Sequence, residues 1–311
     1  MKIDVIIPTY RPGKKFLELM KRLSGQSVKA DRIIIMNTEE KYFDGFLHGT
    51  DFARRYPQAE VHHLSKREFD HGGTRDLAAA KSSADLFVCM TDDAVPADDF
   101  LIERLRDALC QDKDIAVAYA RQLTDESSGE IERYTRAFNY PEESRVKGQE
   151  QLSELGIKTY FCSNVCAMYR KDVFRSLGGF EKHTIFNEDM IYAAKAVKAG
   201  WKIAYAADAC VYHSHSYKVK EQFRRNFDNG VSQAQHPEIF SVVSSESEGM
   251  RMVKKTAAHL CGIGKPWMVL RLAADCGARY LGFFLGKHYR SLPAGMVLRC
   301  SMNRDFWKKR Y

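Results

Sequence analysis

Short apolar runs alternate with amphipathic stretches along the first 120 residues of the chain. Runs at 5–8, 32–36, 60–64, 86–90 and 115–120 predict strands, and residues 13–23 and 100–110 repeat apolar positions at helical spacing. Strands that alternate with helices in this way predict an α/β fold with a parallel sheet and right-handed crossovers. In such folds ligands bind at the carboxyl ends of the strands.

The pattern weakens in the middle of the chain. Residues 122–158 are mostly polar, which predicts a long functional loop or a mobile lid. Strand patterns return at 165–169, 202–205 and 209–212, and a helix is predicted at 189–198. We expect residues 1–230 to form one domain and residues 231–311 to form a helical, basic tail.

Two adjacent carboxylates follow the strand predicted at 86–90. Asp92 and Asp93 would therefore face the crevice at the carboxyl edge of the sheet. Neighbouring carboxylates repel each other unless a cation lies between them, and a hard divalent metal that carries a diphosphate meets this need. The alternative is a helix N-terminus, a role that suits Asp98 and Asp99 better.

Two later clusters carry further candidate chemistry. Glu188 and Asp189 open a helix, where the helix dipole stabilises carboxylates; on local grounds they form an N-cap. His213 and His215 are two residues apart, so both point to one face of an extended segment. One of these imidazoles suits a manganese ion held by a carboxylate, or the two form a hydrogen-bonded surface pair.

A glycine pair precedes the helix predicted at 75–82. The backbone N–H groups of Gly72 and Gly73 can approach an anion there, although an ordinary tight turn has the same pattern. Arg75 is expected to pair with a diphosphate or to hold the Asp92 region through a bidentate contact. The sequence alone leaves both alternatives open.

Composition places the chain among globular, reduced proteins. It has 311 residues, of which 45% are hydrophobic and 28% charged, and its eight cysteines are scattered, several inside apolar runs. Cys162 and Cys166 lack the second pair that a zinc site needs. The N-terminus has no signal-peptide pattern, so a cytoplasmic location is expected.

Positive charge is concentrated in the tail. Residues 251–311 contain thirteen Lys and Arg against two Asp, whereas the preceding residues carry a small excess of acid. No uncharged run approaches the ~18–20 residues that span a bilayer. With its interspersed aromatic residues, the tail is expected to lie on an anionic membrane surface or to form a helical subdomain with a solvated basic face. Large aliphatic residues between the bases, and the lack of a nucleic-acid-binding motif, argue against a nucleic-acid partner.

Five segments, in order, resemble family 2 glycosyltransferases, and most closely the bacterial rhamnosyltransferase branch. They are residues 5–10, 70–76, 90–100, 187–190 and 211–217, so the resemblance spans roughly residues 3 to 230. It implies a GT-A fold, which is Rossmann-like, with a donor half at about 1–120 and an acceptor half at about 121–230. It also implies a nucleotide-sugar donor and a divalent metal, Mn or Mg.

The resemblance implies a role for particular residues. Asp189, with Glu188 beside it, matches the catalytic base, and Asp93 matches the metal-binding acid, with His213 or His215 as a further ligand. The sequence departs from the family pattern at three positions: Thr91 replaces the first Asp of the Asp-x-Asp motif, Asp92 stands where Gln is common, and Asp76 stands where Asn is common. The implied nucleotide site consists of Pro8, Thr9, Tyr10, Asn37, Thr38, Glu39, Gly73, Arg75, Thr91 and Asp92.

The resemblance also implies the reaction. It is an inverting transfer of L-rhamnose from dTDP-β-L-rhamnose to a polyprenyl-diphosphate-linked glycan, such as a cell-surface polysaccharide or O-antigen, by an enzyme peripheral to the cytoplasmic face of the membrane. An alternative is the same fold with a UDP-sugar donor, such as galactofuranose, a hexose or an N-acetylhexosamine. From a different class, a noncatalytic protein that binds nucleotide-sugars or nucleic acid is the other alternative.

Overall fold

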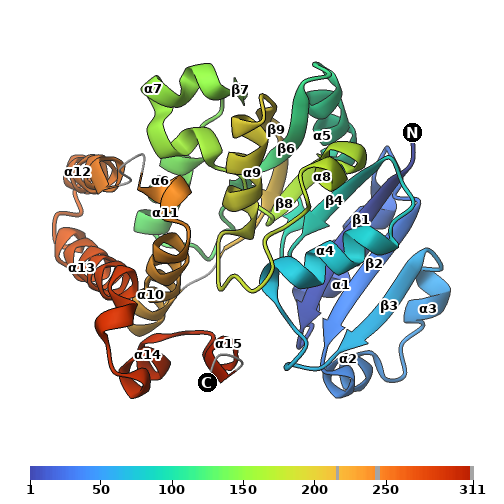
Figure 1. The fold of residues 1–311 in the computed structure, drawn as a ribbon, viewed down its shortest axis with the longest axis horizontal. Helices are drawn as coiled ribbons and strands as arrows, with labels where there is room; N and C mark the ends of the chain where they lie inside the picture. Colours follow the sequence, from blue (N-terminus) through green and yellow to red (C-terminus); the bar gives the residue numbers. More distant parts are fainter. Residues whose placement is uncertain (215–216, 242–245, 309–311) are drawn as a thin grey trace.

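The structure is a computed structural model that describes residues 1–214, 217–241 and 246–308. Within these residues, nine strands form one mixed sheet. Their order is β3-β2-β1-β4-β8-β6-β9-β5, and β7 also pairs with β9 (Figure 1). The strands are β1 (Ile3–Tyr10), β2 (Arg32–Thr38), β3 (Ala59–Leu64), β4 (Leu86–Met90), β5 (Val95–Pro96), β6 (Ile115–Leu123), β7 (Arg145–Lys147), β8 (Cys166–Arg170) and β9 (Lys202–Tyr212). Because β8 opposes both β4 and β6, the strands β3, β2, β1, β4, β6 and β9 all run in one direction. The predicted α/β fold with a mostly parallel sheet is confirmed.

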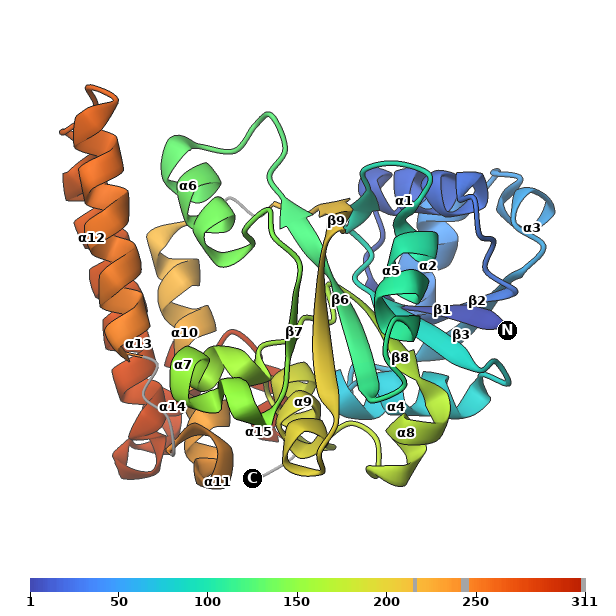
Figure 2. The same ribbon diagram turned by 90° about the horizontal axis from the view of Figure 1, so that it is seen from above.

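Helices cover both faces of the sheet. α1 (Lys14–Gly25) and α5 (Leu101–Cys110) pack on one face, and α4 (His71–Lys81) and α9 (Glu188–Lys198) pack on the other; Figure 2 shows α1 and α4 on opposite sides. Successive side chains of a strand point to opposite faces, so Val5 and Ile7 join the core with α1 whereas Ile6 joins the core with α4. Shorter helices α2 (Glu40–Leu47), α3 (Phe52–Arg55) and α8 (Lys171–Ser176) complete the connections.

Residues 122–158 are folded, so the prediction of a long loop or mobile lid is wrong. They contain α6 (Glu130–Asn139), β7, α7 (Leu152–Leu155) and two 3₁₀ turns, Gln149–Gln151 and Gly156–Tyr160. The buried ammonium of Lys147 donates hydrogen bonds to the carbonyl oxygens of Lys158 and Phe161 at 3.0 and 2.6 Å. The hydrogen bonds of a buried polar side chain therefore hold this segment in place. Hydrophobic periodicity does not reveal contacts of this kind.

The two strands predicted at 202–205 and 209–212 are one strand, β9. Ala120 of β6 pairs with Ala206 of β9, but the next residue of β6, Arg121, pairs with Cys210. The register therefore shifts between these two pairs. Such an irregularity interrupts the alternation of side chains along a strand. The sequence therefore reads as two short strands where the structure has one.

The C-terminal part of the chain is helical. It consists of α10 (Val219–Gln235), α11 (Pro237–Phe240), α12 (Glu246–Gly262), α13 (Met268–Lys287), the 3₁₀ turn Tyr289–Ser291, α14 (Ala294–Cys300) and α15 (Arg304–Lys308). The boundary expected at residue 230 falls inside α10. None of the described helices has the length and hydropathy that crossing a membrane requires.

Glycines bring the backbones of α10 and α13 into contact. A Cβ atom added to Gly282 would lie 2.2 Å from the carbonyl oxygen of Phe223, and one added to Gly286 would lie 2.1 Å from that of Phe227. No side chain fits at such distances. The two helices are therefore held at a fixed separation, and α13 is fastened to the sheet domain through α10.

Replacement of Gly286 by Ala is expected to destabilise the protein, because the new methyl group must displace the α10 backbone. We expect the free energy of unfolding to fall by about 1–3 kcal/mol, the usual cost of overpacking. Gly277→Ala in the same helix is the matched control, since its Cβ would meet nothing within 4 Å. Urea denaturation followed by circular dichroism measures both, and equal effects of the two substitutions would contradict the close helix contact.

Candidate active site

Residues from distant parts of the sequence meet at the carboxyl edge of the parallel strands. Thr9 is the last but one residue of β1, Asp92 and Asp93 follow β4, and His213 follows β9. β8 runs the other way, and Met90 pairs with Cys166, so the segment that enters β8 reaches the same edge. This reversal brings Asn164 to the N-terminus of α9.

The first group at this edge is a pair of adjacent carboxylates, Glu188 and Asp189, of which Glu188 pairs with Arg75. Arg75 NH1 lies 3.2 Å from Glu188 Oε1, and both side chains are buried. Asn164 donates its side-chain N–H to Glu188 Oε1 at 3.2 Å and its backbone N–H to Asp189 Oδ2 at 2.9 Å. Tyr169 OH donates to Asn164 Oδ1 at 2.7 Å and fixes that amide in turn. Both carboxylates are therefore held by donors from other elements.

The two carboxyl groups differ in their acidity. Burial and the adjacent charge of Glu188 raise the pKa of Asp189 to about 7. Burial opposes the ionisation of Glu188 as well, but the charges of Arg75 and His71 and the Asn164 hydrogen bond outweigh it and lower its pKa. Glu188 is thus the ionised partner of Arg75, whereas Asp189, which is only partly buried, exchanges a proton near neutral pH. A carboxylate with these properties suits general-base chemistry.

Arg75 and Gly73 have partners within the protein. Arg75 pairs with Glu188 and also donates to the backbone oxygen of His71 at 3.0 Å; these contacts link it to α9 and not to the Asp92 region, and its contact with a diphosphate stays a prediction. The N–H of Gly73 donates to Asp70 Oδ1 at 2.6 Å, which caps α4 and starts the helix four residues earlier than expected. Gly72 lies so close to the backbone oxygen of Glu181 that a Cβ would be 1.8 Å away from it. These residues join α4 to the segment before α9.

The expected nucleotide residues lie at the ends of β1 and β2. Thr9 Oγ1 donates to Asp92 Oδ2 at 2.6 Å, and burial raises the pKa of Asp92 to about 6. Asn37 and Thr38 are buried, and Asn37 contacts His63 at 2.9 Å, so their side chains lie beneath the edge. Glu39 accepts a hydrogen bond from the backbone N–H of Lys66 at 2.8 Å. Pro8 lies in β1 beside these residues, and Thr91 Oγ1 is buried after β4.

Exposed or partly exposed aromatic and cationic side chains form the rim above this edge. The ring of Tyr10 meets that of Tyr42 edge-on at 5.7 Å, and Arg11 NH2 donates to Tyr42 OH at 2.8 Å. Lys66 Nζ lies 5.0 Å from the centre of the Tyr10 ring. Sequence reasoning selected Tyr10 and missed the other three, because they come from different connections and share no motif.

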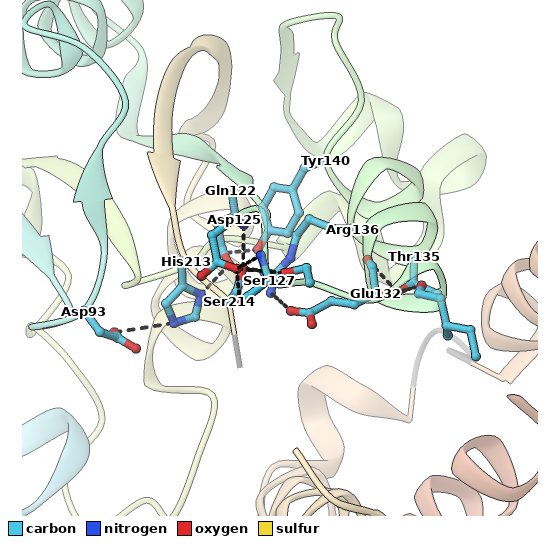
Figure 3. A network of polar contacts seen from close by, with 12 residues as sticks. Asp93, Gln122, Asp125, Ser127, Glu132, Thr135, Arg136, Tyr140, His213 and Ser214 are labelled. Atoms are coloured by element: carbon cyan, nitrogen blue, oxygen red, sulfur yellow. Dashed lines mark hydrogen bonds and ion pairs between the residues drawn. The ribbon is translucent and has the colours of Figure 1, made fainter. Parts of the chain in front are cut away.

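The second group is the pair Asp93 and His213, which Figure 3 shows at one end of a polar network. His213 Nε2 lies 3.6 Å from Asp93 Oδ1, and His213 Nδ1 lies 3.0 Å from Gln122 Oε1. Arg136 also donates to Gln122 Oε1. Since arginine has only donors, this atom is an oxygen, and His213 must donate to it from Nδ1. In the neutral imidazole the lone pair is then on Nε2, the nitrogen that faces Asp93.

Asp93 and His213 offer one carboxylate and one imidazole to a cation. No cluster of three or more His, Cys, Asp or Glu suited to a metal occurs among the residues whose placement is described, and the predicted ligand His215 lies outside those residues. A pair of this kind fits Mn or Mg when phosphate oxygens and water complete the coordination. The role of both residues as metal ligands stays a prediction.

Arg225 in α10 is a cation that sequence reasoning missed. Its guanidinium lies 4.6 Å from the ring centre of Phe186 and 5.6 Å from that of Tyr217. Within the described part of the chain it contacts these rings and no carboxylate. Phe186 precedes the segment that carries Glu188 and Asp189, so Arg225 packs against the approach to α9.

α10 also holds the backbone that leads into α9. Ser232 Oγ donates to the carbonyl oxygen of Phe186 at 2.7 Å, and Asn187 Nδ2 donates to Asn229 Oδ1 at 2.8 Å. Asn187 has a φ of 64°, in the left-handed region that asparagine tolerates better than most residues. The position of Asp189 therefore depends on contacts with the C-terminal helices as well as with the sheet.

Comparisons with known proteins identify the family of this chain. The model of glycosyl transferase family 2 matches residues 4–178. The chain is 37% identical over 309 residues to the O-antigen chain rhamnosyltransferase RfbN of Salmonella typhimurium, with 99% of this chain and 96% of that protein covered. It is 35% identical over 309 residues to the O-antigen chain rhamnosyltransferase WbaN of Salmonella anatum, with 97% and 95% covered.

Solved structures of low sequence identity share the fold. The mannosyltransferase PcManGT from Pyrobaculum calidifontis, in complex with GDP-Man and Mn²⁺, has a TM-score of 0.57 at 13% identity, with 99% of this chain and 83% of that chain covered. Residues 1–349 of S. aureus TarS, in complex with UDP-GlcNAc, have a TM-score of 0.53 at 14% identity, with 94% and 92% covered. The predicted GT-A fold is confirmed. The chain belongs to glycosyl transferase family 2 and is a glycosyltransferase.

Proposed function

We propose that this enzyme transfers L-rhamnose from dTDP-β-L-rhamnose, with inversion, to a polyprenyl-diphosphate-linked O-antigen-type glycan. The names of the two relatives at 37% and 35% identity support the sugar and the type of acceptor. The observation that carries the chemistry is the partly exposed Asp189, whose pKa of about 7 suits proton transfer. A lipid-linked acceptor places the reaction at the cytoplasmic face of a membrane, with the protein peripheral to it.

In this proposal Asp189 is the catalytic base. Its carboxylate accepts the proton of an acceptor hydroxyl as that oxygen attacks the anomeric carbon from the face opposite the diphosphate. Asn164 and Met190 donate backbone N–H groups to the two Asp189 oxygens, at 2.9 and 2.8 Å, and hold the carboxylate in place. Glu188, whose carboxylate is taken up by Arg75 and Asn164, acts as a positioning residue that sets the pKa of Asp189.

Asp93 and His213 would hold the metal, and a bound divalent cation neutralises charge on the departing diphosphate. The Nδ1–H of His213 is directed to Gln122, which leaves Nε2 for the cation. Arg225, next to Phe186, supplies a further positive charge to the leaving group. Thr9, Asp92 and Tyr10 would contact the nucleotide.

Replacement of Asp189 by Asn is expected to remove the base while preserving the size of the side chain. We expect kcat to fall by about 10²–10⁴-fold, the usual contribution of a positioned base. The wild-type kcat/KM is expected to fall with pH below an apparent pKa of about 7, because Asp189 must be ionised to accept a proton. Transfer by Asp189→Asn at the parental rate would contradict the assignment.

In the Glu188→Gln variant, the fall of kcat/KM on the acid side of the pH profile, the acid limb, is expected to occur at lower pH. The change removes the negative charge that helps to raise the pKa of Asp189 and leaves the Arg75 charge beside it. Glu181→Gln, at a carboxylate that pairs with Lys195 at 2.8 Å, is the control and should leave the limb unchanged. A pH profile of kcat/KM for the three proteins makes the measurement, and an upward or absent shift in Glu188→Gln would argue against the coupling.

A panel of nucleotide-sugars tests the donor. We expect turnover with dTDP-β-L-rhamnose, loss of activity in EDTA, recovery with Mn or Mg, and a weaker response to metal in Asp93→Asn. Asp208→Asn, at an exposed carboxylate of β9, serves as the control. Release of dTDP or UDP is the readout, and turnover with UDP-sugars alone would replace the rhamnose assignment by the UDP-sugar alternative.

A further inference from the structure

One side of α13 is apolar and faces away from the protein. Its exposed residues are spaced three or four apart, or are adjacent, and so line one face of the helix. We call this face the apolar stripe: Leu270, Ala273, Ala274, Gly277, Tyr280, Leu281 and Phe284. Leu270, Leu281 and Phe284 are 79%, 52% and 47% exposed, and the stripe contains no charged residue.

The opposite side of α13 fixes this orientation. Leu272, Gly282 and Gly286 are buried, and the two glycines touch the backbone of α10. Figures 1 and 2 both show α13 at the outer edge of the molecule, with α10 between it and α9. The apolar stripe is therefore held outward by close packing.

Basic side chains stand at both ends of the apolar stripe, and an aromatic side chain stands at its start. Trp267, which is 67% exposed, and Arg271 lie at its start, and Lys287 and Arg290 are exposed at its end. The single acidic residue of α13 is Asp275, which is partly buried and lies five residues, roughly 140° of helical rotation, from both Leu270 and Tyr280. An apolar face with basic ends complements an anionic, amphipathic surface.

We propose that the apolar stripe seats the enzyme flat on a bilayer that contains anionic phospholipids. The stripe is about 21 Å long at 1.5 Å per residue, and its aliphatic and aromatic side chains would enter the headgroup boundary while the basic ends contact phosphates. A second copy of the chain fits less well, because pairing two such faces brings like charges together in either direction. The choice of a bilayer over a soluble acidic partner rests on the lipid-linked acceptor of the proposed function.

Seating α13 would also set the orientation of the active site. α13 touches α10 through glycines, and α10 binds Phe186 and Asn187 through Ser232 and Asn229. These contacts form a short rigid path from the bilayer surface to Asp189. The base would then stand at a fixed height above the membrane, at which a lipid-linked hydroxyl is presented.

Vesicle flotation of the full-length protein tests this seat. Vesicles of phosphatidylcholine with about 30% phosphatidylglycerol are compared with pure phosphatidylcholine, since each basic residue contributes about 1 kcal/mol on anionic surfaces. The test variant is Leu281→Glu with Phe284→Glu. The control is Leu77→Glu with Phe100→Glu, which changes net charge equally at side chains that are 45% and 49% exposed, in α4 and at the N-cap of α5.

We expect the wild type and the control to bind the anionic vesicles alike, and the α13 variant to bind at least about tenfold more weakly. Leu270→Glu, at the most exposed position of the stripe, repeats the test should the double variant show a lowered melting temperature. Equal binding by all proteins, or an equal loss in the control, would overturn the proposal. A wild-type dimer in analytical ultracentrifugation that the α13 variant converts to monomer, without vesicle binding, would assign the face to a second copy and overturn it too.

Donor turnover separates this inference from the proposed function. With a short water-soluble acceptor, the wild type, the control and the α13 variant are expected to have the same kcat. Absence of rhamnose transfer by all three would reject the proposed donor, while the vesicle result would still decide the seat.

Discussion

The buried ion pair between Arg75 and Glu188 is the contact on which the active site depends. Removing two charges from water costs several kcal/mol for each ion, so such a pair persists only when further hydrogen bonds complete it. Asn164 provides one to Glu188, and the backbone of His71 accepts one from Arg75. The pair joins α4 to α9, and the positive charge of Arg75 is neutralised by Glu188. Burial and the neighbouring charge of Glu188 raise the pKa of Asp189 to about 7, so its proton is exchangeable near neutral pH.

The same logic governs the other side of the crevice. Gln122 accepts hydrogen bonds from Arg136 and His213, and so determines which imidazole nitrogen faces Asp93. Because arginine can only donate, Arg136 fixes the orientation of the Gln122 amide. That orientation in turn fixes the tautomer of His213. Arg75 and Arg136 each act through a neighbouring side chain. Arg75 pairs with Glu188, whose charge raises the pKa of Asp189, and Arg136 orients Gln122, which fixes the tautomer of His213.

The sequence predicts the first half of the fold well because buried parallel strands leave continuous apolar runs and α1 keeps its helical spacing. It also selects Asp93, Asp189 and His213, which the structure brings to one edge. It fails where a polar side chain has two plausible partners. Arg75 can serve a phosphate or a carboxylate, and only the fold shows Glu188 beside it. Lys147 lies in the polar stretch that predicts a loop, yet it is buried and its hydrogen bonds hold residues 122–158 in place.

β8 has a consequence for how this fold can diversify. Its reversed direction divides the sheet into two parallel blocks, β3-β2-β1-β4 and β6-β9, which meet the crevice from either side. The connection from β8 to α9 starts at the far edge and returns to the crevice with Asp189. Changes in its length or sequence can therefore move Asp189, the proposed base, relative to an acceptor hydroxyl without disturbing the β1 and β2 ends. Regiochemistry and donor choice can then evolve on separate segments of one chain.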